Sequence, residues 1–148
     1  MADQFMQLTG FTELAAALRE LPQRVARNAL RSAVNAGATV IKKEARSRAP
    51  EDSGLLKKNL YQKQIREASG PMIQTFYVGV RTGKKRNKDG TKAEMPFYWR
   101  FMEFGTSKLP PAPFLRPAFE TGKEAAIKAI GEKLDERIQK YAAELAKK

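Results

Sequence analysis

The spacing of apolar residues predicts a short helix near the start of the chain, over residues 11–21. Leu14, Leu18 and Leu21 recur there at intervals of three to four residues, so they share one helical face. Pro22 follows directly, and its ring lacks the backbone N–H that a continuing helix needs. We therefore expect the first helix to end before residue 22.

A longer helix is predicted for residues 23–48. Pro50 closes it, because the residue before a proline is pushed out of the helical conformation. Most side chains on its apolar face are small, and Gly37 there costs about 1 kcal/mol of helix propensity, which suggests close packing of another backbone. This face consists of Ala26, Leu30, Ala33, Gly37, Val40, Ile41 and Ala45.

The middle of the chain favours extended structure. Two antiparallel strands are predicted, over residues 55–65 and 73–81, with a turn at Gly70 and Pro71 and a third strand near 92–96. The second strand is rich in β-branched and aromatic residues, which are typical of strands. Its apolar face carries Phe76, Val78 and Val80.

An aromatic helix is predicted between Pro96 and Gly105, where the glycine stops it in the left-handed helical conformation. Phe97, Phe101 and Phe104 share one of its faces, and we expect this face to be core. The alternative is a platform on which nucleic-acid bases stack. Such platforms interleave aromatic and basic residues, however, and the run contains a single arginine.

A final helix is predicted from Pro117 to the end of the chain. Its apolar stripe consists of Phe119, Lys123, Ala126, Ile127, Ile130, Leu134, Ile138, Tyr141 and Leu145. The predicted fold class is therefore α+β, with a small antiparallel sheet packed by the helix over 23–48 and by this C-terminal helix. Residues 1–148 are expected to form a single domain.

Composition narrows the possible functions. With no cysteine and no histidine, the chain lacks cysteine nucleophiles, disulfides, the usual zinc ligands and the commonest general base. We expect a binding protein rather than an enzyme, with no cofactor and no metal. No apolar run reaches the roughly 18 residues of a membrane span, and the first residues do not resemble a secretory signal. The chain is therefore expected in the cytoplasm during synthesis.

The net charge of +12 makes contact with DNA plausible. Two groups of cations are candidates for phosphate contacts, one in a polar loop over 81–92 and one on a basic face of the long helix. An equally open interpretation is that these side chains are simply solvated, in a flexible loop and on the wet side of an amphipathic helix. The candidates are Arg81, Lys84, Lys85, Arg86, Lys88, Lys92, Arg27 and Arg31.

Glu103 is a carboxylate among aromatic residues, where it must be paired or solvated. Arg100 lies three residues before it, and Arg116 follows beyond the proline-rich loop. We expect Glu103 to form a structural salt bridge with Arg100 or Arg116 rather than to act as a general base.

The region 98–119 carries a recognisable motif. In the notation (Y/W)-x-x-F-x-E-F-G-T-S-x-x-P-x-x-P-F-L-R-P-A-F, it resembles the tail-component family of long-tailed phages. An upstream segment, Ala49-Pro50-Glu51-Asp52-Ser53-Gly54, resembles the A-P-x-x-T/S-G turn of the same family, with Leu56 following. The resemblance covers the chain from about residue 14 to 119. It implies a structural protein of the virion neck, where the tail meets the head.

The resemblance also implies partners. By analogy with phage tails, we expect a homo-oligomeric ring, sixfold in symmetry, that contacts neighbouring neck, connector and tail-tube proteins and lets packaged DNA pass without sequence preference. A stiff proline-rich loop loses little entropy on docking, so Pro113, Phe114, Leu115 and Arg116 are the predicted subunit interface. The alternative function is a sequence-independent DNA-binding protein that forms no ring, and only charge favours it.

Overall fold

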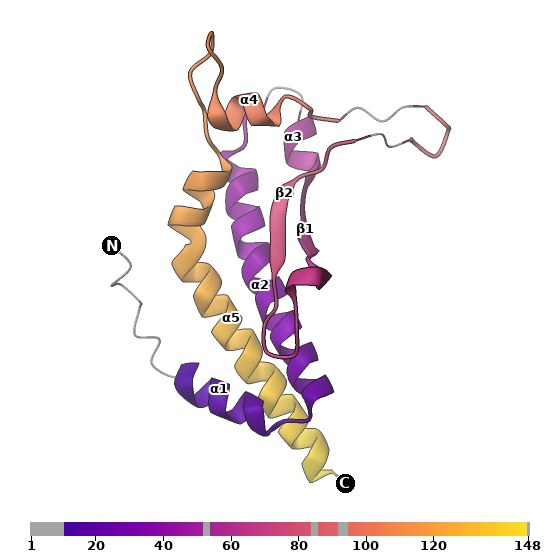
Figure 1. Cartoon of the computed structure of the whole chain (residues 1–148), viewed down its shortest axis with the longest axis vertical. Coiled ribbons are helices and arrows are strands. Elements are labelled where there is room, and N and C mark those ends of the chain that lie inside the picture. Colours follow the sequence, from indigo (N-terminus) through magenta and orange to yellow (C-terminus); the bar gives the residue numbers. More distant parts are fainter. Residues whose placement is uncertain (1–10, 52–53, 84–85, 92–94, 148) are drawn as a thin grey trace.

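The computed structural model describes residues 11–51, 54–83, 86–91 and 95–147. The described part is an elongated α+β unit (Figure 1). Its elements, in chain order, are α1 (Phe11–Glu20), α2 (Gln23–Arg48), α3 (Leu55–Lys58), β1 (Leu60–Gln64), the 3₁₀ turn η1 (Arg66–Ala68), β2 (Phe76–Val80), α4 (Trp99–Phe104) and α5 (Leu115–Ala146).

The two long helices α2 and α5 run antiparallel, side by side, along the longest dimension of the molecule (Figure 1). Small residues let them approach closely, as the sequence predicted for α2. A Cβ atom added at Gly37 would lie 2.6 Å from Cγ1 of Ile130, and one at Gly122 would lie 3.2 Å from Cδ1 of Ile41. The glycines are therefore points where side chains of one helix pack onto the backbone of the other.

The β1–β2 hairpin packs against α2. The strands are antiparallel, with Leu60 opposite Val80 and Gln64 opposite Phe76. The side-chain amide of Gln62 reaches α2, where it donates to Oδ1 of Asn35 at 2.6 Å. This bond fixes the hairpin against the long helix, so the sheet and the helix pair form one body.

Buried apolar residues form two clusters, one toward each end of the helix pair. The first is made of Ala45, Ala49, Leu56, Leu60, Val80, Phe114 and Ala118. The second joins α1 to α2 and α5 and contains Leu18, Ala26, Ala29, Ala33 and Leu134, with Leu14 and Leu21 packed against it. The leucine face predicted for the first helix is therefore confirmed.

Several predicted boundaries change. Residues 55–58 form α3 instead of the start of a strand, and the amide of Asn59 ends this helix by donating to the carbonyl of Leu55 at 2.8 Å. The third strand near 92–96 lies mostly outside the described residues. The last helix begins at Leu115, and its predicted stripe is wrong at both ends, since Phe119 and Leu145 are exposed. None of the helices in the described part combines the length and apolarity that a membrane crossing requires.

Candidate assembly surface at the α4–α5 junction

Glu103 is the one buried charged residue of the described part, and it accepts hydrogen bonds from the beginning of α5. Its Oε2 accepts from the backbone N–H of Phe114 at 2.8 Å and of Leu115 at 3.0 Å, and its Oε1 accepts from that of Arg116 at 3.0 Å. Pro117 comes next and has no N–H to satisfy. One carboxylate and one proline therefore account for every backbone donor position from 114 to 117.

This arrangement replaces an ordinary helix cap. Phe114 occupies the N-cap position of α5 and offers no side-chain oxygen to the free N–H groups. The carboxylate of Glu103 supplies that oxygen from another helix. Its negative charge also lies at the end of α5 where the helix dipole is positive, which is a favourable electrostatic interaction.

The predicted salt bridge of Glu103 is wrong. Within the described residues, the ion pairs do not include Glu103. The guanidinium of Arg100 lies over the ring of Trp99 instead, 5.5 Å from its centroid. Arg116 contacts Glu103 through its backbone N–H, and its side chain is exposed. Backbone donors suffice because three N–H groups satisfy a buried carboxylate without a second buried charge.

The loop between α4 and α5 is tied back to α4. Gly105 ends α4 with φ 74° and ψ 177°, a combination that is positive in φ but not left-handed helical as predicted. A Cβ at this position would lie 2.8 Å from the backbone N of Pro111. The backbone N–H of Ala112 donates to the carbonyl of Met102 at 2.7 Å. The loop therefore has a defined conformation before any partner binds.

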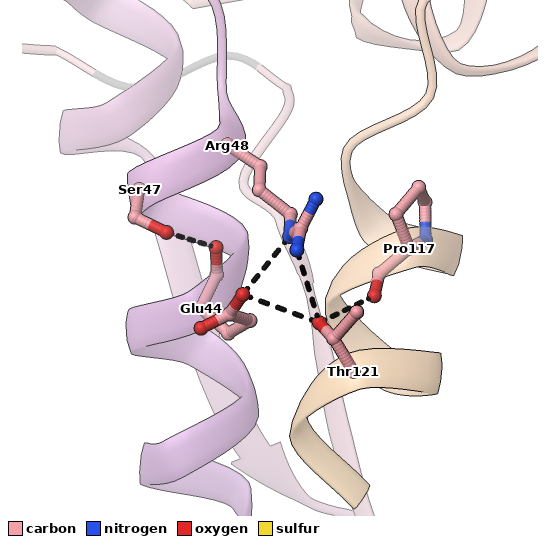
Figure 2. Close-up of polar contacts among 5 residues, drawn as sticks. All are labelled: Glu44, Ser47, Arg48, Pro117 and Thr121. Carbon is pink, nitrogen blue, oxygen red and sulfur yellow. Dashed lines mark hydrogen bonds and ion pairs between the residues drawn. The ribbon is translucent and has the colours of Figure 1, made fainter.

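Below this junction, a polar network joins the first turns of α5 to the last turns of α2 (Figure 2). Oε1 of Glu44 lies 2.9 Å from Nε of Arg48 and 3.2 Å from Oγ1 of Thr121. Arg48 also donates to Thr121 at 3.3 Å, and Thr121 lies 2.8 Å from the carbonyl of Pro117. These bonds hold the start of α5 against α2. The end of α5 that Glu103 of α4 caps is therefore fixed in position.

The predicted interface residues divide into two groups. Phe114 has no exposed surface and belongs to the first core cluster, so its side chain is not available to a partner, contrary to the prediction. The cap explains this, because it turns the chain inward at residue 114. Leu115 is partly buried against the same cluster, whereas Pro113 and Arg116 are exposed.

The aromatic residues predicted as core are instead on the surface. Phe97, Phe101 and Phe104 are 75%, 53% and 65% exposed, and Leu109 in the following loop is 61% exposed. We call these four residues the aromatic surface. The opposite side of α4 packs inward through Trp99, Met102 and Glu103. Helical spacing identified a shared face correctly, but it did not indicate which face the core would cover.

The motif is thus largely architectural, with a glycine, a capping carboxylate and an inward phenylalanine that together present an exposed aromatic face. A family model described as "Bacteriophage HK97-gp10, putative tail-component" matches residues 12–105, which is more than half of the chain. The chain belongs to this family. No curated protein and no solved structure gives a significant match.

The HK97-gp10-like match confirms the resemblance drawn from the sequence, and it makes the chain a structural component of the phage tail, and so of the virion. The matched residues run from α1 to Gly105. They include Glu103, Phe97 and the two phenylalanines of α4, whereas the proline-rich loop and α5 lie beyond them.

The cations predicted to contact DNA are scattered in this tail component. Arg81 packs over the ring of Tyr61, 5.2 Å from its centroid. Arg86 and Lys88 are exposed near the tip of the 81–92 loop, while Lys84, Lys85 and Lys92 lie outside the described residues. Arg27 and Arg31 are exposed on α2, so the structure does not bring them together with the loop.

The tip of that loop is a tight turn. The backbone N–H and the hydroxyl of Thr91 both donate to Oδ1 of Asp89, at 2.9 and 2.6 Å. These bonds, the hydroxyl bond foremost, hold the pKa of Asp89 below its ordinary value because they stabilise the ionised form. The turn therefore carries a carboxylate among its cations at neutral pH.

Proposed function

We propose that this tail component is a subunit of a closed ring at the head–tail junction, where it completes or joins the tail and lets DNA pass. Its role is binding rather than catalysis, with the host cytoplasm as the place of assembly. The observation that carries the proposal is the aromatic surface of α4. Contiguous exposed apolar side chains mark interaction sites, and aromatic anchors dominate interface energetics.

The aromatic surface is also organised in advance. The Glu103 cap, the Gly105 turn and the Ala112–Met102 hydrogen bond hold the loop and α4 in place. An anchor that is already ordered loses little conformational entropy on binding, so more of its apolar burial contributes to affinity. This supports a docking role over that of an incidental exposed patch.

A ring needs a second, different surface on the same subunit, because its contacts run head to tail. An apolar groove of about 380 Å³ lies between α2, β2 and α5 and offers such a surface. Its lining includes Ile41, Val78 and Ile127, and the exposed Phe119 lies at it. We assign to it the aromatic surface of a second copy of this chain.

The test compares two double variants, each of which replaces two exposed apolar side chains by serine. Phe101→Ser with Phe104→Ser removes half of the aromatic surface, whereas Met72→Ser with Ile73→Ser removes two exposed apolar side chains from the hairpin loop. Particles that carry the first pair are expected to accumulate as separate heads and tails in electron micrographs. Particles that carry the second pair are expected to be complete, and thermal unfolding of both purified variants should match the parent chain.

Complete particles with Phe101→Ser and Phe104→Ser would contradict the proposal. The alternative function, a DNA-binding protein without ring assembly, predicts that both double variants behave alike in particles. It also predicts a subunit that stays a monomer or dimer in sizing experiments while it binds duplex DNA.

A further inference from the structure

A basic cleft lies between the first half of α2 and the last half of α5. These parts of the two helices are at the other end of the molecule from α4 (Figure 1). The hollow there measures about 610 Å³. Arg31 lines it from α2, and Arg137 and Lys140 line it from α5. The neutral part of the lining combines apolar Val25, Ala29 and Phe76 with side chains that carry hydrogen-bonding groups, among them Ser32, Asn35 and Tyr141.

The cationic lining continues toward the hairpin. Arg31 also borders a second hollow of about 370 Å³, together with Lys63 of β1 and Arg66 of η1. We call Arg31, Lys63, Arg66, Arg137 and Lys140 the basic cleft. Two carboxylates border the same hollows, Glu144 and Glu67. Five cations from four elements (α2, β1, η1 and α5) thus border these hollows together with two acids.

Among the described residues, these five cations form no ion pair. The ion pairs that are present there involve other lysines and arginines. The side chain of Arg137 is oriented by a hydrogen bond from its guanidinium to Oγ of Ser32, at 2.9 Å across the two helices. All five side chains are exposed, so an anion can reach them without unfolding anything.

We infer that the basic cleft binds the phosphate backbone of duplex DNA without sequence preference. DNA carries a layer of condensed counterions. Protein cations that are not already paired displace these counterions when they bind the phosphates, and the release strongly favours binding of nucleic acid. Hydroxyl and amide groups between the cations can donate to phosphate oxygens, as they do in most backbone contacts. The inference rests on the proposed function, because a ring through which DNA passes brings DNA to its subunits. It adds the surface of the subunit that DNA contacts.

The position of the cleft fits that function. The segment around α4, which carries the aromatic surface, and the helix segments that line the basic cleft lie at opposite ends of the α2–α5 pair (Figure 1), so one subunit has room to contact a neighbour and DNA at once. The sequence placed most candidates in the 81–92 loop, whose described residues, 81–83 and 86–91, project to one side of the molecule near α3 (Figure 1). The inference therefore moves the main phosphate contact from the loop to the cleft.

Two triple variants with the same loss of charge separate these sites. Arg31→Gln, Arg137→Gln and Lys140→Gln neutralise the cleft, whereas Arg81→Gln, Arg86→Gln and Lys88→Gln neutralise described cations at the loop. Binding of a fluorescent 24-base-pair duplex to the full chain is measured by anisotropy at several salt concentrations. The cleft variant should bind about tenfold or more weakly, and the slope of log affinity against log salt should decrease by about 2–3. The loop variant should stay within about threefold of the parent chain, and circular dichroism melts check that both variants fold.

Three outcomes would overturn the inference. Equal losses in the two variants would indicate an effect of net charge alone, and a larger loss in the loop variant would place the contact there. If polyglutamate displaces the labelled duplex as effectively, per negative charge, as unlabelled duplex does in a competition assay, the result would indicate an acidic protein as the partner. Absence of salt-dependent DNA binding by the parent chain would exclude the site. Because the assay uses free subunits, each of these results is independent of the particle test of α4.

Discussion

The carboxylate of Glu103, in α4, accepts a hydrogen bond at 2.8 Å from the backbone N–H of Phe114, the N-cap residue of α5. The bond couples two features of the motif that look unrelated in the sequence. It fixes where α5 begins, and it turns the ring of Phe114 into the core. As a result, α4 is held with its aromatic side outward.

Replacing Glu103 by Ala should lower the free energy of unfolding by about 2–4 kcal/mol, because three backbone N–H groups lose a charged acceptor in a buried place. Glu103→Gln should cost less, since its amide oxygen can still accept from some of them. Urea denaturation of the purified chain measures both changes. Glu124→Ala removes the same charge from an exposed position of α5 and should change stability by no more than about 0.5 kcal/mol. A Glu103→Ala chain as stable as the Glu124→Ala chain would show that the cap is dispensable.

Phe114→Ala and Phe104→Ala should differ strongly in their effect on stability, although both shorten a phenylalanine near the same junction. The first empties a fully buried position and should cost about 3–5 kcal/mol of stability. The second removes a ring that is 65% exposed, so stability should change little. Thermal unfolding of the two variants side by side tests this. Similar melting temperatures would mean that Phe114 is not a core residue in solution.

Gly105→Ala should destabilise the chain more than Gly54→Ala. Both glycines have positive φ, at 74° and 71°, so both substitutions strain the backbone by about 1–3 kcal/mol. Only at Gly105 would the new Cβ meet backbone atoms, those of Pro111 and Leu109, and at Gly54 it would meet nothing within 4 Å. Denaturation midpoints measure the difference, and the reverse order would contradict the loop conformation described for 105–111.

The long helices and the sheet could be predicted because their signals are local. The bounds of α2 match the predicted 23–48, since Pro22 and Pro50 bracket a continuous helical period. The small residues Ala26, Ala33 and Ala45 are buried as expected. The hairpin followed from β-branched and aromatic residues, although the first strand is shorter than predicted.

The candidate site was harder to predict because its decisive contacts are made by backbone groups. Side-chain chemistry suggested an arginine partner for Glu103, whereas the actual partners are N–H groups that any sequence carries. One signal was available, since the N-cap position of α5 is Phe114 and not a Ser, Thr, Asp or Asn whose side chain could cap the helix. A helix without its own cap indicates that another element supplies one. The exposed aromatic face had no such signal, because helical spacing is the same for a core face and a docking face.

The antiparallel pairing of α2 and α5 has a consequence for the dimensions of any assembly. A helix rises about 1.5 Å per residue, so the 26 residues of α2 span about 39 Å. Close packing of α2 and α5 at Gly37 and Gly122 makes this helix pair a rigid element of nearly constant length. In the proposed ring, the helix pair would set the distance between the subunit contact at α4 and the surface that faces the DNA channel. The length of the helices would then determine the width of that channel.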